Sequence, residues 1–160
     1  MMKTARIAYI ALLGALSIVF GYIESLFPIP IAIPGIKLGI SNIVVLFALI
    51  KMNKSDAFFV LIIKVLVCSL LFSGINSLFY SFLGGLFSFF AMIFALKSGF
   101  STIGASMAGG VFHNIGQILA ASIMLLSPAP LYHLPVLLLS ELIVGGIVGV
   151  LCKTVMSHLK

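Results

Sequence analysis

Long apolar runs separated by short polar segments dominate the chain. The runs cover residues 5–22, 37–50, 57–72, 77–96, 102–126 and 134–156. A helix needs roughly 20 apolar residues to cross a hydrocarbon core of ~30 Å, although a shorter helix can be held inside a bundle. The pattern therefore predicts an all-α integral membrane protein, with six transmembrane helices in a single domain that spans residues 1–160.

The segment 24–35 differs from the other connections because it contains three prolines and is nevertheless apolar. Each proline removes a backbone donor and disfavours helix in the residue before it, so the segment is expected to be an irregular loop. An apolar loop of this kind either rests in the lipid headgroups or covers a cavity as a lid. The sequence leaves both interpretations open.

Composition supports a membrane location. Apolar residues make up 62% of the chain and charged residues only 8%, whereas a soluble domain usually carries about 25% charged residues. The net charge of +6 does not indicate nucleic acid, because the basic residues form no patch and stand singly at the ends of apolar runs. Membrane proteins keep their basic residues at such positions.

The basic residues also predict the orientation. With the N-terminus in the cytoplasm, the cytoplasmic side receives seven basic residues and the outside receives one, Lys37. The seven are Lys3, Arg6, Lys51, Lys54, Lys97, Lys153 and Lys160. Cytoplasmic loops carry the excess of Lys and Arg. We therefore expect a multi-pass protein of the cytoplasmic membrane with both termini inside the cell.

Several ionisable and amide side chains fall within the predicted helices, where such groups are costly and mark function by default. Lys64 lies ~12 Å from the cytoplasmic end of the third helix and Glu141 ~10 Å from the outer end of the sixth. His113 and Gln117 are four residues apart, so they share one face of the fifth helix, and Asn114 lies beside Gln117. His113 and Glu141 are expected at similar depths, in the outer half of the membrane.

Further polar residues stand at the outer ends of the helices. Lys37 and Asn42 are near the start of the second helix, and Asn76 and Tyr80 begin the fourth. Together with the intramembrane residues they predict a ligand-binding cavity that opens outward beneath the proline-rich loop. Each group also has a structural interpretation: Lys64 can extend its stem to the headgroups, and His113 with Gln117 can join helices. Asn76 and Tyr80 can be ordinary interface residues.

Small residues form a second pattern. Ala8, Ala11 and Ala15 follow one face of the first helix, Gly145 and Gly149 are spaced likewise in the sixth, and the fifth carries Ala105, Gly109 and Gly116. Small faces let helices approach closely. For the fifth and sixth helices this indicates packing within the bundle. For the first helix, a face that docks another protein is a serious alternative.

Three stretches carry a resemblance to known families. Residues 6–15, with the Ala11 and Ala15 pair, resemble the first helix of the substrate-binding S components of energy-coupling factor (ECF) transporters. Residues 33–44 and 111–117 are similar to the Gx transporter family, which is also called heptaprenyl diphosphate synthase component I. The resemblance covers nearly the whole chain.

The resemblance to S components implies a six-helix fold with an outward-facing pocket under the loop between the first two helices. It also implies that the first helix meets a transmembrane coupling subunit and that two separate ATPase subunits supply energy. On this interpretation the chain captures a small polar or amphipathic molecule, which is anionic if Lys37 and Lys64 contact it.

Two rival functions belong to other classes. As component I, the chain would be an accessory membrane subunit of a heptaprenyl diphosphate synthase. It cannot carry prenyl elongation alone, because that chemistry needs clustered carboxylates for magnesium and the acidic residues are only Glu24, Asp56 and Glu141, far apart in sequence. A solitary proton-coupled transporter using Glu141 and His113 is the other alternative. We expect no catalytic residues, no cofactor and no metal, since Cys68 and Cys152 lack metal-binding spacing.

Overall fold

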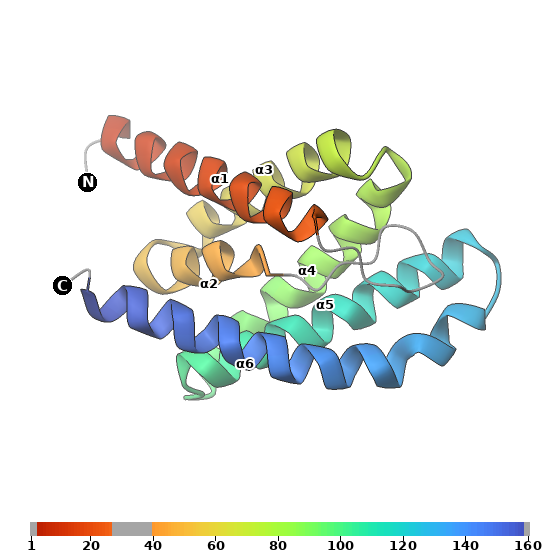
Figure 1. Cartoon of the computed structure of the whole chain (residues 1–160). Coiled ribbons are helices and arrows are strands. Elements are labelled where there is room, and N and C mark those ends of the chain that lie inside the picture. Colours follow the sequence, from red (N-terminus) through yellow and green to blue (C-terminus); the bar gives the residue numbers. More distant parts are fainter. Residues whose placement is uncertain (1–2, 27–39, 159–160) are drawn as a thin grey trace.

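The computed structural model describes residues 3–26 and 40–158 and is all-helical over these ranges (Figure 1). The elements, in chain order, are α1 (Lys3–Ser25), α2 (Asn42–Lys51), α3 (Lys54–Phe72), α4 (Asn76–Lys97), α5 (Thr102–Met124), the 3-10 turn η1 (Ala129–His133) and α6 (Leu134–His158). Both described ends of the chain lie at the same end of the bundle (Figure 1). The prediction of an all-α fold is confirmed.

The ends of two helices differ from the predicted ones in ways that affect the site. α1 continues to Ser25, so Glu24 belongs to a helix and not to the loop. α2 begins at Asn42 and not at Lys37, and Lys37 itself lies outside the described residues. The proline-rich loop also lies almost wholly outside them. α5 ends at Met124, two residues before the predicted end.

Four helical segments in the described part of the chain are long and apolar enough to cross a membrane, namely Thr4–Ser25, Lys54–Phe72, Asn76–Lys97 and Ala129–His158. α2 has only 10 residues, a length of ~15 Å. α5 is long enough, but its Ser, Gly, His, Asn and Gln residues lower its mean hydropathy. The chain is therefore a multi-pass membrane protein, while the count of six spans stays a prediction.

α5 is the central helix, because it packs along both α4 and α6. Glycines permit this closeness. A Cβ atom at Gly116 would lie 2.8 Å from the Gly84 Cα of α4, and one at Gly149 would lie 2.7 Å from the Ile103 Cα of α5. Because these contacts join backbone to backbone, no side chain can move aside to admit a methyl group. The small residues of α5 and α6 thus serve packing within the bundle.

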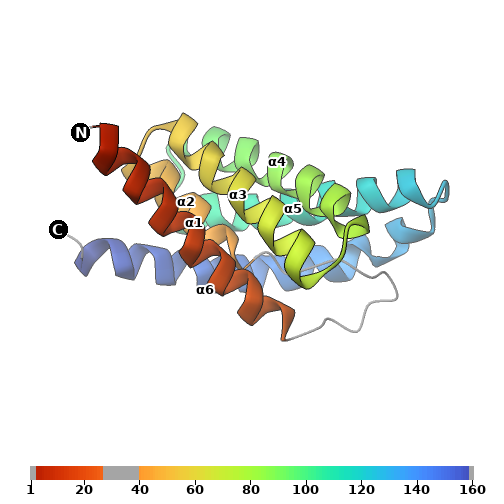
Figure 2. The ribbon, with the colours of Figure 1, turned by 90° about the horizontal axis from the view of Figure 1, so that it is seen from above.

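α1 lies at the periphery and crosses α2 at an angle, with α3 alongside (Figure 2). It packs mainly on α3, where Gly14 meets Ile63 and Gly21 meets the Cys68 thiol. Among the described residues α1 makes no contact with α6. Among the described α-helices, α1 therefore packs against the fewest other helices.

An ion pair ties α1 to α3 near their first turns. The Nε and Nη2 atoms of Arg6 both donate to Asp56 Oδ1, at 2.8 and 2.5 Å. The Asp56 side chain is 3% exposed, whereas Arg6 is 46% exposed. A buried carboxylate that loses its partner is left with an uncompensated charge. The pair was not predicted, because the two residues are 50 positions apart.

We expect Arg6→Gln to lower the thermal unfolding temperature in mild detergent by several degrees, since it leaves Asp56 buried without its guanidinium. Lys54→Gln removes a charge from an exposed position two residues away from Asp56 and is expected to change the unfolding temperature little. Equal shifts in the two variants would mean that the ion pair contributes nothing.

Candidate functional site

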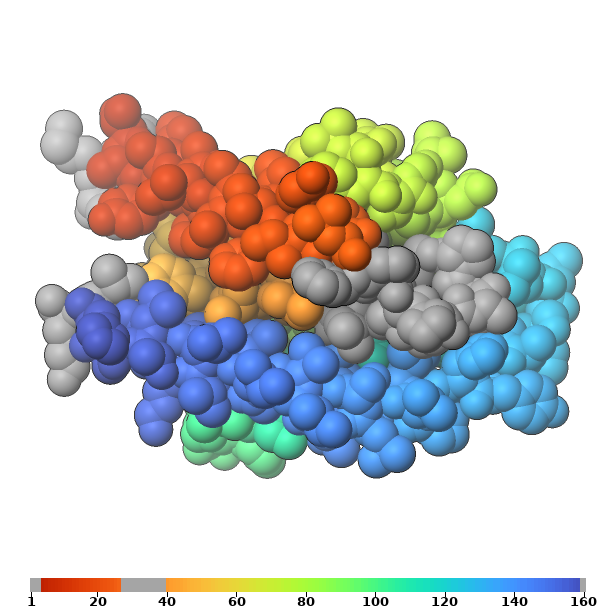
Figure 3. All heavy atoms as spheres, viewed as in Figure 1, coloured from red at the N-terminus to blue at the C-terminus, as the bar shows by residue number. Residues whose placement is uncertain are grey.

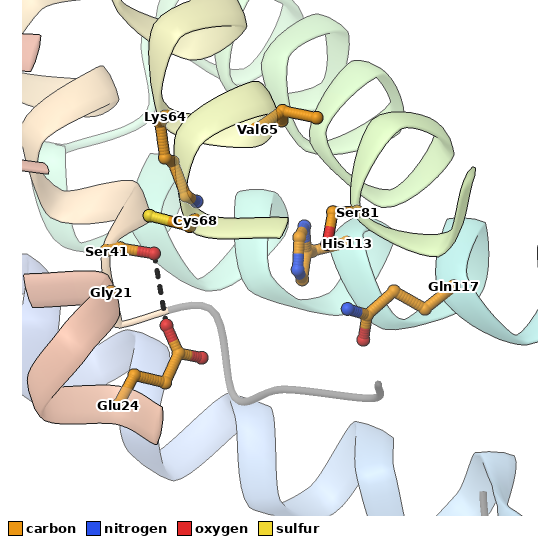
Figure 4. A pocket seen from close by; sticks show the side chains of 9 residues that line it. All are labelled: Gly21, Glu24, Ser41, Lys64, Val65, Cys68, Ser81, His113 and Gln117. Carbon is orange, nitrogen blue, oxygen red and sulfur yellow. Dashed lines mark hydrogen bonds between the residues drawn. The ribbon is translucent and has the colours of Figure 1, made fainter. Parts of the chain in front are cut away.

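Polar side chains from α1, α3, α4 and α5 surround a small cavity inside the bundle (Figure 4). Its volume is about 20 Å³, which is enough for roughly one water molecule. The lining consists of Gly21, Glu24, Ser41, Lys64, Val65, Cys68, Ser81, His113 and Gln117. Polar groups with this degree of burial are unusual in a protein whose outer surface is apolar.

Lys64 is buried in the middle of α3, with 6% of its surface exposed. Its ammonium group donates a short hydrogen bond to the side-chain oxygen of Asn42, the first residue of α2. One interpretation of the sequence was that the Lys64 side chain extends to the headgroups. The hydrogen bond to Asn42 shows that it does not. The nitrogen of the Asn42 amide is buried and has no hydrogen-bond partner among the described residues, so this amide retains a donor.

Glu24 is the main feature of the site that the sequence analysis missed. It stands in the last turn of α1, is 5% exposed, and accepts a hydrogen bond of 3.0 Å from the Ser41 hydroxyl. Helical spacing could have identified Glu24 as a site residue, because Ser17, Gly21 and Glu24 follow one face of α1. It was not recognised because Glu24 was assigned to the loop.

His113 and Gln117 both line the cavity, as their spacing on one helix face suggests. Gly84 of α4 makes room for them. A Cβ atom at Gly84 would lie 2.8 Å from Gln117 Cγ and 2.9 Å from the His113 carbonyl oxygen. Because α4 has no side chain at this point, the two polar groups can occupy the space between α4 and α5.

Glu141, on α6, is not among the residues that line the cavity. It is 2% exposed, and its carboxylate rests on Gly110 of α5, where a Cβ atom would lie 2.2 Å from Oε1. Within the described part of the chain, Glu141 forms no ion pair with Lys64 or His113, and its Oε2 atom has no hydrogen-bond partner. The direct pairing considered from sequence is therefore not found.

The remaining predicted site residues lie elsewhere. Asn114 faces α6 and donates to the Leu137 carbonyl oxygen at 3.1 Å. Tyr80 packs with Ala120 and Ala121 in an apolar cluster, and Asn76 is exposed at the start of α4. None of these three lines the cavity.

A family model described as heptaprenyl diphosphate synthase component I matches residues 13–155. The chain belongs to this family. No curated protein and no solved structure matches it. The matched range includes every described cavity-lining residue and omits residues 1–12, which hold the first ten residues of α1, and residues 156–160.

Membership in the component I family agrees with the expectation that this chain is not itself an enzyme, since component I is an accessory, non-catalytic subunit. The structure gives the three acidic residues different surroundings: Glu24 lines the cavity, Asp56 pairs with Arg6, and Glu141 rests on Gly110. Over the described ranges, no group of three His, Cys, Asp or Glu side chains could hold a metal ion.

Proposed function

We propose that this component I family member is a membrane-embedded, substrate-binding subunit, similar in role to an S component, that captures a small molecule at its polar cavity. The cavity as described has room for roughly one water molecule, so the proposal requires it to widen when the ligand binds. The observation that carries the proposal is the set of buried polar groups that four helices of an apolar chain direct at one point. Ionisable and amide side chains buried within the helices of a membrane protein are costly and are typical of functional sites. A purely structural role would be served more cheaply by apolar side chains.

The proposed ligand contacts are Lys64, His113 and Gln117, joined by Glu24 and Ser41. Asn42 contributes its free amide nitrogen from beside Lys64, and Glu141 contributes its carboxyl group from α6. Lys37 keeps its proposed role at the outer mouth. Asn76, Tyr80 and Asn114 are weaker candidates, because each has a role or a position outside the cavity.

We propose six spans, with both termini in the cytoplasm and the cavity opening outward. In a background without Cys68 and Cys152, both of which are buried, Tyr132→Cys is expected to react with an impermeant thiol reagent in whole cells. Asn53→Cys is expected to be protected until the cells are opened. Tyr132 and Asn53 are both exposed, so protein burial does not explain a difference. The reverse labelling pattern would contradict the orientation.

The first helix is the proposed docking face for a transmembrane coupling subunit, which two ATPase subunits would serve. Ala8, Ala11 and Ala15 are all exposed, and α1 has few neighbours in the bundle. We expect Ala11→Leu with Ala15→Leu to abolish partner association while the chain stays folded, since the added bulk blocks close helix approach. Gly146→Leu adds bulk to an open position on α6 and should leave association intact. Normal assembly of the double variant would remove α1 from this role.

The family match favours a second candidate, an accessory membrane subunit of heptaprenyl diphosphate synthase in isoprenoid biosynthesis. The two functions require different partners. Affinity purification in mild detergent would recover a coupling subunit and ATPases for the first function, and a prenyltransferase for the second.

A further inference from the structure

An apolar groove runs between α1 and α6, with α2 as its floor (Figure 3). It has a volume of about 360 Å³ and its lining has no polar surface. Leu12, Leu16 and Phe20 form one wall, Val44 and Phe47 the floor, and Val155 part of the other wall. The groove exists because α1 and α6 make no contact with each other among the described residues.

The length of the groove matches one leaflet of a bilayer. Along α1 it extends from Tyr9 to Phe20, a rise of ~16 Å at 1.5 Å per residue. The hydrocarbon core is ~30 Å thick, so half of it is ~15 Å. Tyr9 lies six residues, or ~9 Å, from the first residue of α1, and Phe20 lies five residues, or ~8 Å, from its last.

Basic residues stand at the surface end of the groove. Lys51 is one turn beyond Phe47 on α2, and Lys153 follows Cys152 on α6. Both are exposed. The acidic residue at this end of the bundle, Asp56, is buried and paired with Arg6, so it does not cancel their charge. Basic residues that flank a hollow between membrane helices favour an acidic lipid headgroup.

We propose that the groove is a binding site for an anionic phospholipid, with one acyl chain along α1, α2 and α6 and the phosphate beside Lys51 and Lys153. The groove's length of ~16 Å along α1 suits one acyl chain in a single leaflet. Its apolar lining suits a chain with no polar atoms. This site is separate from the polar cavity, so the inference holds or fails independently of the proposed function.

The chain contains no tryptophan, which permits a direct test in vesicles. Leu16→Trp places a fluorophore on the groove wall, and Ile143→Trp places one on an exposed face of α6 outside the groove. The two positions are at similar depth, 13 residues from the start of α1 and 15 residues from the end of α6. Quenching is measured with brominated phosphatidylglycerol and brominated phosphatidylcholine, and Val155→Trp repeats the measurement from the other wall.

We expect the groove tryptophans to prefer phosphatidylglycerol by at least about fivefold, the effect of roughly one lysine near a charged membrane surface. Ile143→Trp should show no preference, and Lys51→Gln with Lys153→Gln should remove the preference in the groove. Equal preference at Leu16→Trp and Ile143→Trp would overturn the proposal. Groove tryptophans that neither lipid quenches would also overturn it, because they would indicate a protein occupant. Displacement of the brominated lipid by farnesyl diphosphate, in preference to anionic phospholipid, would overturn it as well.

Discussion

Glu141→Gln is expected to weaken ligand binding by more than about tenfold, or ~1.4 kcal/mol, while thermal stability stays nearly unchanged. Glutamine keeps the shape of the side chain and removes its ionisable carboxyl group. Because Glu141 forms no ion pair among the described residues and Oε2 has no hydrogen-bond partner, the folded protein loses no direct contact. A carboxyl group that serves the ligand would be lost completely.

The measurement is the ligand-induced thermal shift, made with the small molecule that copurifies with the wild-type chain. Ser140→Ala is the matched control, since the Ser140 hydroxyl bonds only within α6, to the Leu137 carbonyl oxygen. Gln117→Ala is expected to weaken binding more mildly, because it removes a neutral hydrogen bond. If Glu141→Gln lowers stability and reduces binding only in proportion, Glu141 is a structural residue.

Gly116→Ala is expected to lower the free energy of unfolding by at least about 2 kcal/mol, because an added methyl group must push α4 and α5 apart. The atoms it would meet are the Gly84 Cα and N and the Leu83 carbonyl oxygen, all of them backbone. The same shift would displace His113 and Gln117, which flank this crossing. Ligand binding should therefore fall together with stability.

Gly146→Ala provides the matched control. Gly146 is also a helical glycine, but a Cβ atom there would meet nothing within 4 Å. Alanine favours helix over glycine by up to about 1 kcal/mol, so this variant should be neutral or slightly stabilising. Chemical denaturation in detergent compares the two variants. Equal stability would show that the crossing of α4 and α5 can relax to accept a methyl group.

The sequence predicted the helices and the polar positions on α5 well, for a physical reason. Apolar runs of membrane length have few alternatives to helix, because every backbone polar group in lipid must be paired internally. Spacing within one helix then determines which side chains share a face, so His113 and Gln117 could be grouped in advance. The depth of Lys64 within its helix could be estimated, but whether its side chain stays buried or extends to the headgroups could not.

Relations between helices could not be predicted from spacing. Asn114 is adjacent to His113 in sequence, yet it faces Leu137 of α6 while His113 lines the cavity. Glu24 looked like a loop residue because prolines follow closely, but proline restricts the residue before it and leaves earlier turns free. The partners Asn42 for Lys64 and Ser41 for Glu24 depend on how α1, α2 and α3 pack, and no local pattern encodes that packing.

The central claim is that the buried polar cavity captures a small molecule for delivery to partner subunits. Mass spectrometry of the small molecules and proteins that accompany the wild-type chain and Glu141→Gln in mild detergent tests it most directly. We expect a small molecule enriched with the wild-type chain and lost from the variant, while a coupling subunit and ATPases accompany both. A wild-type chain that carries no more small molecule than the variant, with a prenyltransferase as its only partner, would contradict the claim.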